Sequence, residues 1–209
     1  MNKTLIKDAL ILALITVIAG TLLGGVYMLT KEPVSRQKQI TKEKAYAKVF
    51  EVADSFEEVK DFDSEKATNS IDQEAFPKEE YSIDALVNAL DKQGQLLGYV
   101  ITVTTQNGYG GAVTLVMGVK LDGTVNGIDF LTLNETAGLG MKAKEIDFMK
   151  QFKNKNVPVF TYTKSGATED AEIDAISGAT ITTKAVTYAV DAGLDYFRVL
   201  TQGGAQNES

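Results

Sequence analysis

The stretch AVTLVMGVKLDGTVNGIDFLTL, residues 112–133, contains two apolar runs separated by a turn signal. Both runs are rich in Val, Ile, Leu and Thr, which are typical of extended strands. The connecting LDGT at 121–124 supplies Asp and Gly, which favour a tight turn. The pattern therefore predicts two strands of an antiparallel sheet joined as a hairpin.

Similar runs precede this hairpin, and helical patterns follow it. IDALVNALD at 83–91 and LLGYVITVTT at 96–105 are joined by the turn signal DKQGQ, so the sheet gains two strands. After the sheet we expect a helix in MKAKEIDFMKQF at 141–152, a short strand in PVFTY at 158–162, and a last helix from about Thr183 to Leu200. One side of that helix carries Val186, Val190, Leu194 and Phe197. The order of elements predicts an α+β fold.

The N-terminal region contains ALILALITVIAGTLLGGVYMLT, residues 9–30, which has 22 residues without a charge. A helix of roughly 20 apolar residues is long enough to cross a bilayer. A cleaved signal peptide is the alternative, but its apolar stretch is usually about 7–15 residues long and ends in a small-x-small site. We therefore predict a retained single transmembrane helix.

The chain divides into five predicted segments. Residues 1–8 form a short stub, residues 9–30 the transmembrane helix and residues 31–60 a juxtamembrane helix or stalk that starts near Pro33. Residues 61–200 form the folded domain, and its first part, from about Lys60 to Glu80, is acidic and polar and is interpreted as a loop. The small, polar tail at 201–209 is expected to be disordered.

Composition excludes several classes of function. The net charge of -7 and the pI near 4.8 argue against a nucleic-acid-binding surface, which needs clustered Lys and Arg. The chain has no Cys and no His, which excludes disulfides, thiolate nucleophiles, Cys-held zinc or iron–sulfur clusters and His-based triads. We predict no metal site and no catalytic residues of the chain's own, so redox chemistry would need a cofactor.

The tetrapeptide SGAT occurs twice, at 165–168 and at 177–180. The second copy leads into the last helix, where free N–H groups suit either a phosphate or an ordinary helix cap, and Thr182 or Thr183 would serve as that cap. The first copy is followed by EDAE, whose three charges would repel a phosphate. We interpret the first copy as a surface turn.

Three segments resemble a known family. DAISGATITTKAV at 174–186 resembles the flavinylation signature of FMN-binding domains, in which the last Thr of S/T-G-A-T carries FMN through a phosphoester. NGYGGAVTLVMGVKLDGTVNGIDFL at 107–131 and NETAGLGMKA at 134–143 resemble the corresponding segments of the RnfG family, which belongs to the Rnf electron-transport complex. The resemblance covers residues 80–200 or so, and the N-terminal anchor agrees with it.

The resemblance implies a set of cofactor-binding residues. Thr180 would be the covalent attachment site, with Ser177, Gly178 and Ala179 around the phosphate, and Asp174 would belong to the signal that the attaching enzyme reads. Against the flavin ring would lie Glu135, Thr136, Gly138, Leu139 and Gly140. Family members often have Pro where this chain has Ala137, a difference that removes no contacting side chain.

The resemblance also implies partners and a location. A Thr hydroxyl is a poor nucleophile without an activating base, and the family's flavin transferase, which uses FAD and Mg²⁺, would supply the activation. The chain would then relay electrons among other subunits of a complex that couples electron transfer between ferredoxin and NAD⁺ to Na⁺ or H⁺ transport. It would sit in the cell membrane with the FMN domain on the extracytoplasmic face, although more Lys and Arg follow the apolar helix than precede it.

Three alternative interpretations remain open at this point. The equivalent FMN subunit of a sodium-pumping NADH:quinone reductase shares this domain, but those subunits tend to be longer. A membrane-anchored binding module without a cofactor would use the SGAT loops only as turns. A hydrolase is suggested by SRQK at 35–38 and KSG at 164–166, but Ser35 lies beside the membrane and outside the sheet.

Overall fold

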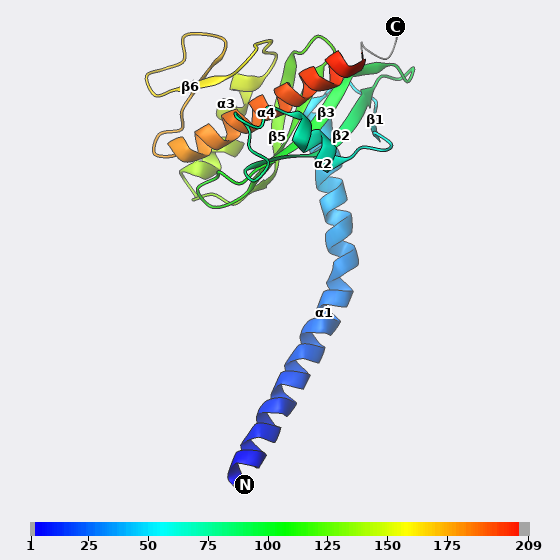
Figure 1. Ribbon diagram of the computed structural model, residues 1–209, viewed down its shortest axis with the longest axis vertical. Coiled ribbons are helices and arrows are strands. Elements are labelled where there is room, and N and C mark those ends of the chain that lie inside the picture. Colours follow the sequence, from blue (N-terminus) through cyan, green and yellow to red (C-terminus); the bar gives the residue numbers. More distant parts are fainter. Residues whose placement is uncertain (1–2, 205–209) are drawn as a thin grey trace. The chain divides into compact units, whose positions relative to one another are not determined.

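A five-stranded antiparallel sheet forms the centre of the protein, whose computed structural model describes residues 3–204 (Figure 1). The strands lie in sequence order: β1 (Ser55–Glu58), β2 (Tyr81–Leu90), β3 (Leu96–Thr105), β4 (Val113–Lys120) and β5 (Val125–Leu133). β2 to β5 confirm the four strands predicted from sequence. β1 was not predicted, and it pairs with β2 at the edge of the sheet, ahead of the boundary expected at residue 61.

Apolar side chains cover both faces of the central strands. In β4, Leu115 and Met117 point to one face and Val116 to the other, and all three are fully buried. Successive side chains of a strand point to opposite faces, so each face can support its own core. The larger core lies under the C-terminal helix, and a smaller one lies under the last turns of the N-terminal helix.

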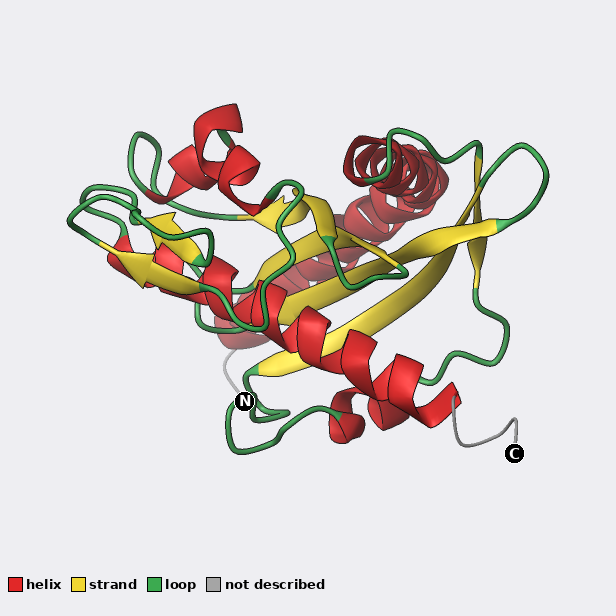
Figure 2. Cartoon of the chain, turned by 90° about the horizontal axis from the view of Figure 1, so that it is seen from above, coloured by secondary structure: helices red, strands yellow, loops and turns green. Residues whose placement is uncertain are grey.

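The C-terminal helix α4 (Thr180–Gly204) crosses the first face of the sheet (Figure 2). The predicted apolar side of this helix is buried, with Val186 and Val190 inaccessible to solvent. The helix and the sheet are in close contact, since a Cβ at Gly193 would lie 2.2 Å from the Met117 sulfur. Glycine at this position therefore allows the helix axis to approach the sheet.

The last turns of helix α1 (Lys3–Val49) cover the second face. A Cβ at Gly118 in β4 would lie 2.4 Å from the Val49 carbonyl oxygen, so glycine is needed there too. The Asn126 side-chain amide donates to that same carbonyl at 2.7 Å. Lys48 pairs with Asp129 of β5 at 2.9 Å. The end of α1 is thus part of the folded domain.

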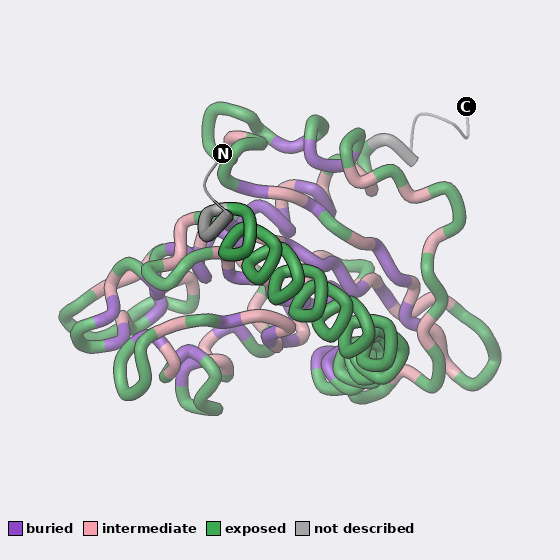
Figure 3. Tube along the Cα trace, turned by 90° about the horizontal axis from the view of Figure 1, so that it is seen from below, coloured by how far each residue is buried: buried purple, intermediate pink, exposed green. Residues whose placement is uncertain are grey.

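Earlier in α1, the helix is long and apolar enough to cross a membrane, by length and composition. Its described side chains are exposed from Ile6 to Ile40 (Figure 3). The expectation that Pro33 starts a new helix is wrong, because α1 continues through it. Pro33 removes one backbone hydrogen bond, and the good helix formers that follow it, among them Gln, Lys and Ala, keep the helix intact.

Other expectations also need correction. The segment interpreted as a loop contains helix α2 (Ser64–Ser70), which the Asp63 side chain caps by accepting from the Lys66 N–H at 3.1 Å. The helix expected at 141–152 is broken into η1 (Gly140–Lys144), α3 (Ile146–Met149) and η2 (Lys150–Phe152). The short strand near 158–162 is β6 (Thr161–Thr163), and it pairs in parallel with β7 (Glu172–Asp174), which was not predicted.

The last helix is longer than predicted at both ends. It starts at Thr180, because Gly178 adopts φ 77° and forms the turn that leads directly into the helix. It continues to Gly204, four residues into the segment expected to be disordered, and the rest of that segment lies outside the described residues.

Asp191 is a buried carboxylic acid on α4, with 4% of its surface exposed. Its Oδ1 atom accepts a hydrogen bond from the Phe160 N–H at 2.8 Å. Burial raises the pKa of Asp191 to about 7, against the opposing effects of that hydrogen bond and of Arg198. The ionised form is therefore disfavoured in the folded state.

We predict that Asp191→Asn stabilises the protein above neutral pH. The folded state holds the Asp191 proton more strongly than the unfolded state, so the free energy of unfolding falls as pH rises from about 4 to about 7. Asn keeps an acceptor for the Phe160 N–H without a charge. The gain should be about 2–4 kcal/mol at pH 8 and should shrink towards pH 4.

Denaturant titrations of the full chain in detergent at several pH values measure this difference. The exposed Glu79→Gln is the matched control and should show no such pH dependence. Equal effects of Asp191→Asn at pH 5 and pH 8 would contradict the prediction.

Candidate functional site

The register of the sheet brings two loops together at one end. Val113, the first residue of β4, pairs with Leu133, the last residue of β5. The loop before β4, residues 106–112, and the segment after β5, from residue 134, therefore leave the sheet side by side. They contain the G-Y-G-G and N-E-T-A-G-L-G motifs singled out from the sequence.

Glycines allow these two loops to pack closely. A Cβ at Gly110 would lie 1.8 Å from the Asn134 carbonyl oxygen, which no other residue could tolerate without moving the backbone. A Cβ at Gly108 would lie 3.0 Å from the Glu135 Oε1 atom. The Tyr109 N–H donates to that same oxygen at 2.9 Å. The loop before β4 thus holds Glu135 in place.

The second SGAT copy forms the entry to α4 and faces these loops. Gly178 has φ 77°, and a Cβ there would lie 3.0 Å from Leu139 Cδ2. The buried Thr183 hydroxyl fixes the turn, because it donates to the Ala179 carbonyl and accepts from the Ile176 N–H, both at 3.0 Å. The first N–H groups of a helix have no partner within it, so those of Thr180, Ile181 and Thr182 are available to a ligand, whereas the Thr183 N–H donates to the Ala179 carbonyl at 3.0 Å.

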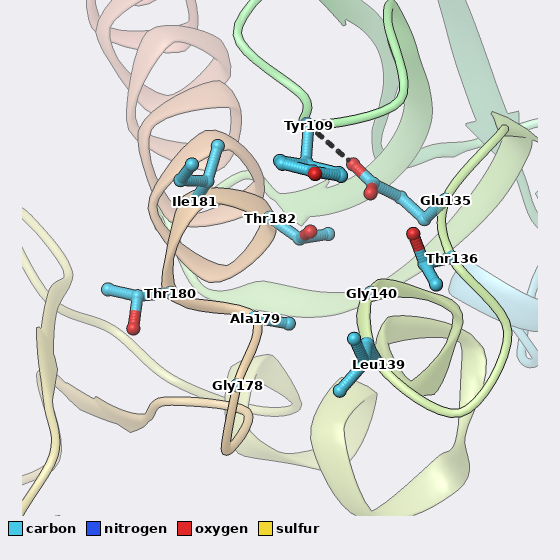
Figure 4. Close-up of a pocket in the computed structure, with 10 residues that line it drawn as sticks. All are labelled: Tyr109, Glu135, Thr136, Leu139, Gly140, Gly178, Ala179, Thr180, Ile181 and Thr182. Atoms are coloured by element: carbon cyan, nitrogen blue, oxygen red, sulfur yellow. Dashed lines mark hydrogen bonds between the residues drawn. The ribbon is translucent and has the colours of Figure 1, made fainter.

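A pocket of about 500 Å³ lies between these three segments (Figure 4). Its size suits a cofactor or small ligand. Thr180 lies across the pocket from Glu135, and the Thr182 side chain points into the space between them (Figure 4). The lining residues are Tyr109, Glu135, Thr136, Leu139, Gly140, Gly178, Ala179, Thr180, Ile181 and Thr182.

The lining combines apolar surface with a single charge. Tyr109, Leu139 and Ile181 are large apolar side chains that remain 70%, 41% and 53% exposed. Glu135 is the one charged side chain among the ten lining residues. A flat apolar ring with a polar edge would match such a surface, whereas a free phosphate would find no Lys or Arg in the lining. Within residues 3–204, no group of three or more carboxylates could hold a metal ion.

Seven of the ten residues predicted from sequence line this pocket, and three do not. The seven are Glu135, Thr136, Leu139, Gly140, Gly178, Ala179 and Thr180. Gly138, at φ 76°, forms the turn within its loop. Ser177 and Asp174 lie outside the pocket, on a neighbouring hollow beside α3.

Sequence reasoning did not assign Tyr109, Ile181 or Thr182 to the site. Tyr109 stands inside the G-Y-G-G motif, so the motif could have identified it. Ile181 has an apolar side chain at the start of a helix and gives no signal in sequence. Thr182 was interpreted as a helix cap or as one of the hydroxyls beside a phosphate, and the pocket places it beside Gly140, where a Cβ would lie 2.6 Å from its hydroxyl oxygen.

Asp174 connects the two SGAT copies. Its Oδ1 atom accepts a hydrogen bond from the N–H of Ala167, which belongs to the first copy, at 2.5 Å. Its own N–H donates to the Gln151 side chain at 2.6 Å. In the same loop, the N–H and hydroxyl of Thr168 bind Glu172 and hold the pKa of that carboxyl below its usual value. The first copy is therefore an exposed turn that binds the chain's own carboxylates.

Comparisons with known proteins agree with this geometry. Residues 108–195 match the FMN-binding domain family, and residues 1–49 match the RnfG N-terminal region. The G component of the Na(+)-translocating ferredoxin:NAD(+) oxidoreductase complex of Acetobacterium woodii is 31% identical over 96% of this chain and 95% of its own length. The proton-translocating counterpart of Clostridium ljungdahlii is 32% identical over 89% of this chain and 88% of its own length.

Two further similarities are more distant. The G component of the ion-translocating oxidoreductase complex of Methanosarcina acetivorans is 28% identical over 93% of this chain and 95% of its own length. Among solved structures, NqrC of Shewanella oneidensis superposes with a TM-score of 0.48 at 20% identity, over 68% of this chain and 75% of that one.

We predict that Asp174→Ala releases the first SGAT loop whereas Asp174→Asn keeps it in place. Alanine removes the acceptor for the Ala167 N–H, so that amide should exchange with solvent about tenfold faster. Asparagine retains an acceptor oxygen, so exchange should rise less. Amide exchange measured by NMR provides the test, with the Phe160 N–H as internal control because it binds Asp191, outside the loop. An unchanged Ala167 amide in Asp174→Ala would contradict the prediction.

Proposed function

We propose that this chain, which belongs to the RnfG family, relays electrons through FMN bound covalently to Thr180. Members of that family are subunits of ion-translocating ferredoxin:NAD⁺ oxidoreductase complexes. The proposal rests on the pocket that Thr180, Glu135 and Leu139 line together, because three separate motifs converge there. The match to the FMN-binding domain family covers all three.

The residues present fit a flavin. Tyr109, Leu139 and Ile181 offer exposed apolar surface for a ring, and the glycines of the lining let the segments that form the pocket pack closely against one another. Glu135 adds a fixed acceptor, because one of its oxygens is already held by the Tyr109 N–H. We propose that Glu135, Thr136, Leu139 and Gly140 lie against the ring, with Gly138 shaping their loop. FMN would supply the redox chemistry, and the protein its position and electrostatic surroundings.

A covalent link through Thr180 is favoured by the charges of the site. Non-covalent phosphate sites usually combine a helix N-terminus with Lys or Arg, and none of the ten lining residues is basic. A tether removes the need for high affinity, because it keeps the local concentration of the ring high. Ser177, Gly178 and Ala179 would form the loop beside the phosphate.

Among the ten residues of the pocket lining, none lies where it could activate the Thr180 hydroxyl. The chain contains no His, and Glu135, the charged residue of the lining, lies across the pocket from Thr180 (Figure 4). An external flavin transferase would therefore be required. We propose that Asp174 belongs to the signal that this enzyme reads. Asp174 is exposed, and its bond to Ala167 gives its surface loop a defined shape.

Within the complex, we propose that the protein passes electrons between other subunits and has no complete active site of its own. Its relatives are named as subunits of oxidoreductase complexes that translocate Na⁺ in one case and protons in another. The two identities, 31% and 32%, are nearly equal, so similarity in this subunit does not favour either coupling ion.

We further propose that α1 anchors the chain in the cell membrane with the FMN domain, residues 61–200, outside the cytoplasm. Two Lys precede the apolar stretch, and five basic residues lie between residues 31 and 44. That count alone would favour the opposite orientation. Long domains can cross the membrane regardless of flanking charge, so the count is a weak guide here.

We predict that Thr180→Ala abolishes covalent flavin whereas Thr168→Ala retains it. Only Thr180 lines the pocket, and the Thr168 hydroxyl is bound to Glu172 in the first copy. The test is flavin fluorescence in a denaturing gel after expression in a host that contains the flavin transferase. A fluorescent Thr180→Ala band, or a colourless wild-type protein from that host, would contradict the proposal.

We also predict that a protease added to intact spheroplasts digests the FMN domain. If the domain lies outside the cytoplasm, cleavage needs no lysis, and a cytoplasmic marker protein should remain whole in the same sample. Immunoblotting against the domain measures the result. Digestion that occurs only after lysis would place the domain in the cytoplasm.

A further inference from the structure

A second cavity, of about 830 Å³, lies along the middle of α4 and does not include any residue of the flavin pocket. One wall comes from the segment after α2, with Phe76, and another from β6 and the residues just before it, with Tyr162. Tyr188, Asp191, Asp195 and Arg198 line it from the helix. Nothing in the proposed electron relay uses this cavity.

Asp191 forms the buried, polar part of this cavity. Its Oδ1 atom is bound to the Phe160 N–H at 2.8 Å, and within the described residues no hydrogen bond reaches its Oδ2 atom. An asparagine could bind the same N–H without the cost of a buried charge. Among the described residues, the buried side-chain oxygens without a hydrogen-bond partner are those of Tyr46 and Thr102, so Asp191 Oδ2 is reachable from the cavity, where a ligand could donate to it.

The rim of the cavity is held by a network in which, within residues 3–204, no ion pair includes Asp191. Asp195 accepts from the Asp72 N–H at 2.8 Å and lies 3.5 Å from the Arg198 guanidinium. Arg198 also donates to the Pro158 carbonyl. Within the described chain, three carboxylates and one guanidinium line the cavity, so its net charge is negative when Asp191 is ionised. A cation would complement it.

The walls of the cavity suit a cation with an apolar stem. Phe76, Tyr162 and Tyr188 are partly buried aromatic residues that line it. The Lys184 ammonium already lies 5.2 Å from the centre of the Tyr188 ring, so this ring attracts positive charge from within the chain. A guanidinium group stacks on aromatic rings and binds a carboxylate through two donors.

We propose that this cavity receives an arginine side chain of a partner subunit, whose guanidinium binds Asp191 between the aromatic walls. The methylene stem would lie on Phe76 and Tyr162, and the head would donate to Asp191 Oδ2. The proposal rests on the family's membership of a multi-subunit complex and does not depend on flavin attachment. Failure of either proposal can therefore be recognised separately.

Binding of a cation should depend on pH through Asp191. The groups that face it are Asp195 and Arg198 on α4, Asp72 on the segment after α2, and the phenols of Tyr162 and Tyr188. Because burial raises the pKa of Asp191 to about 7, the Asp191 carboxyl ionises between pH 6 and pH 8. Affinity for a guanidinium should rise over this range, by up to about tenfold per pH unit below that pKa.

The first test titrates the full chain in detergent with N-acetyl-L-arginine amide and follows the Phe160 and Ala75 amide signals by NMR. N-acetyl-L-citrulline amide has nearly the same shape without the charge, and it should bind at least about tenfold more weakly. Asp191→Asn should weaken arginine binding to the same extent and remove its pH dependence. Glu79→Gln, an exposed charge outside the cavity, should change neither.

Several results would overturn the proposal. Equal binding of the arginine and citrulline compounds would exclude a charge-selective site, and so would unchanged affinity in Asp191→Asn. No binding of the arginine amide up to 100 mM would also overturn it. Binding of the free amide below about 10 µM would indicate a small-molecule site and would overturn the assignment to a partner side chain.

The second test compares the purified complex with the isolated chain by hydrogen exchange. Residues 72–76 and Phe160 should exchange about tenfold more slowly in the complex, and Asp191→Asn should remove part of that protection. The turn at 91–95, which does not line the cavity, serves as the control segment. Equal exchange of residues 72–76 in the complex and the isolated chain would overturn the proposal.

Discussion

The structure depends on the close contact of two helices with opposite faces of β4. Gly118 lets the end of α1 rest on one face, and Gly193 lets α4 rest on the other around Met117. A side chain at either position would push a helix away from the sheet and open its core. The apolar residues that alternate along β4 then fill both cores, so one strand organises both layers.

This arrangement also positions the pocket beside Thr180. The pairing of Val113 with Leu133 fixes which loops are neighbours, and the packing of α4 fixes where its first turn lies. The site is therefore built from three segments that the sheet and helix hold rigidly, although each segment is a loop or a helix end. The glycines of the 108–111 loop have the same role on a smaller scale, since they let it touch Asn134 and Glu135.

The sequence predicted some of these features and could not predict others. The strands from 83 to 133 were recognisable because their apolar runs and turns are local. Helix α2 and strand β7 depend on tertiary partners: the α2 residue Thr68 accepts from the Ile83 N–H, and β7 is held by Gln151. In the site, motif residues such as Leu139 and Gly178 were identified, whereas Ile181 became visible only through the fold. The bond from Asp174 to Ala167 joins two loops and likewise has no local signal.

Helix α4 sets the distance between the two cavities. Thr180 is its first residue, and Asp191 lies eleven positions later, which corresponds to about 16 Å along a helix. Helix α4 packs along the sheet from the pocket beside Thr180 to Phe197, which lies beside Gly123 in the turn between β4 and β5. The spacing between Thr180 and Asp191 therefore cannot change without disrupting the core. A partner held at Asp191 would therefore sit at a fixed separation from a ring tethered at Thr180. If FMN is attached to Thr180 as proposed, such a rigid connection would constrain the position of the partner as firmly as the proposed phosphoester would constrain the flavin.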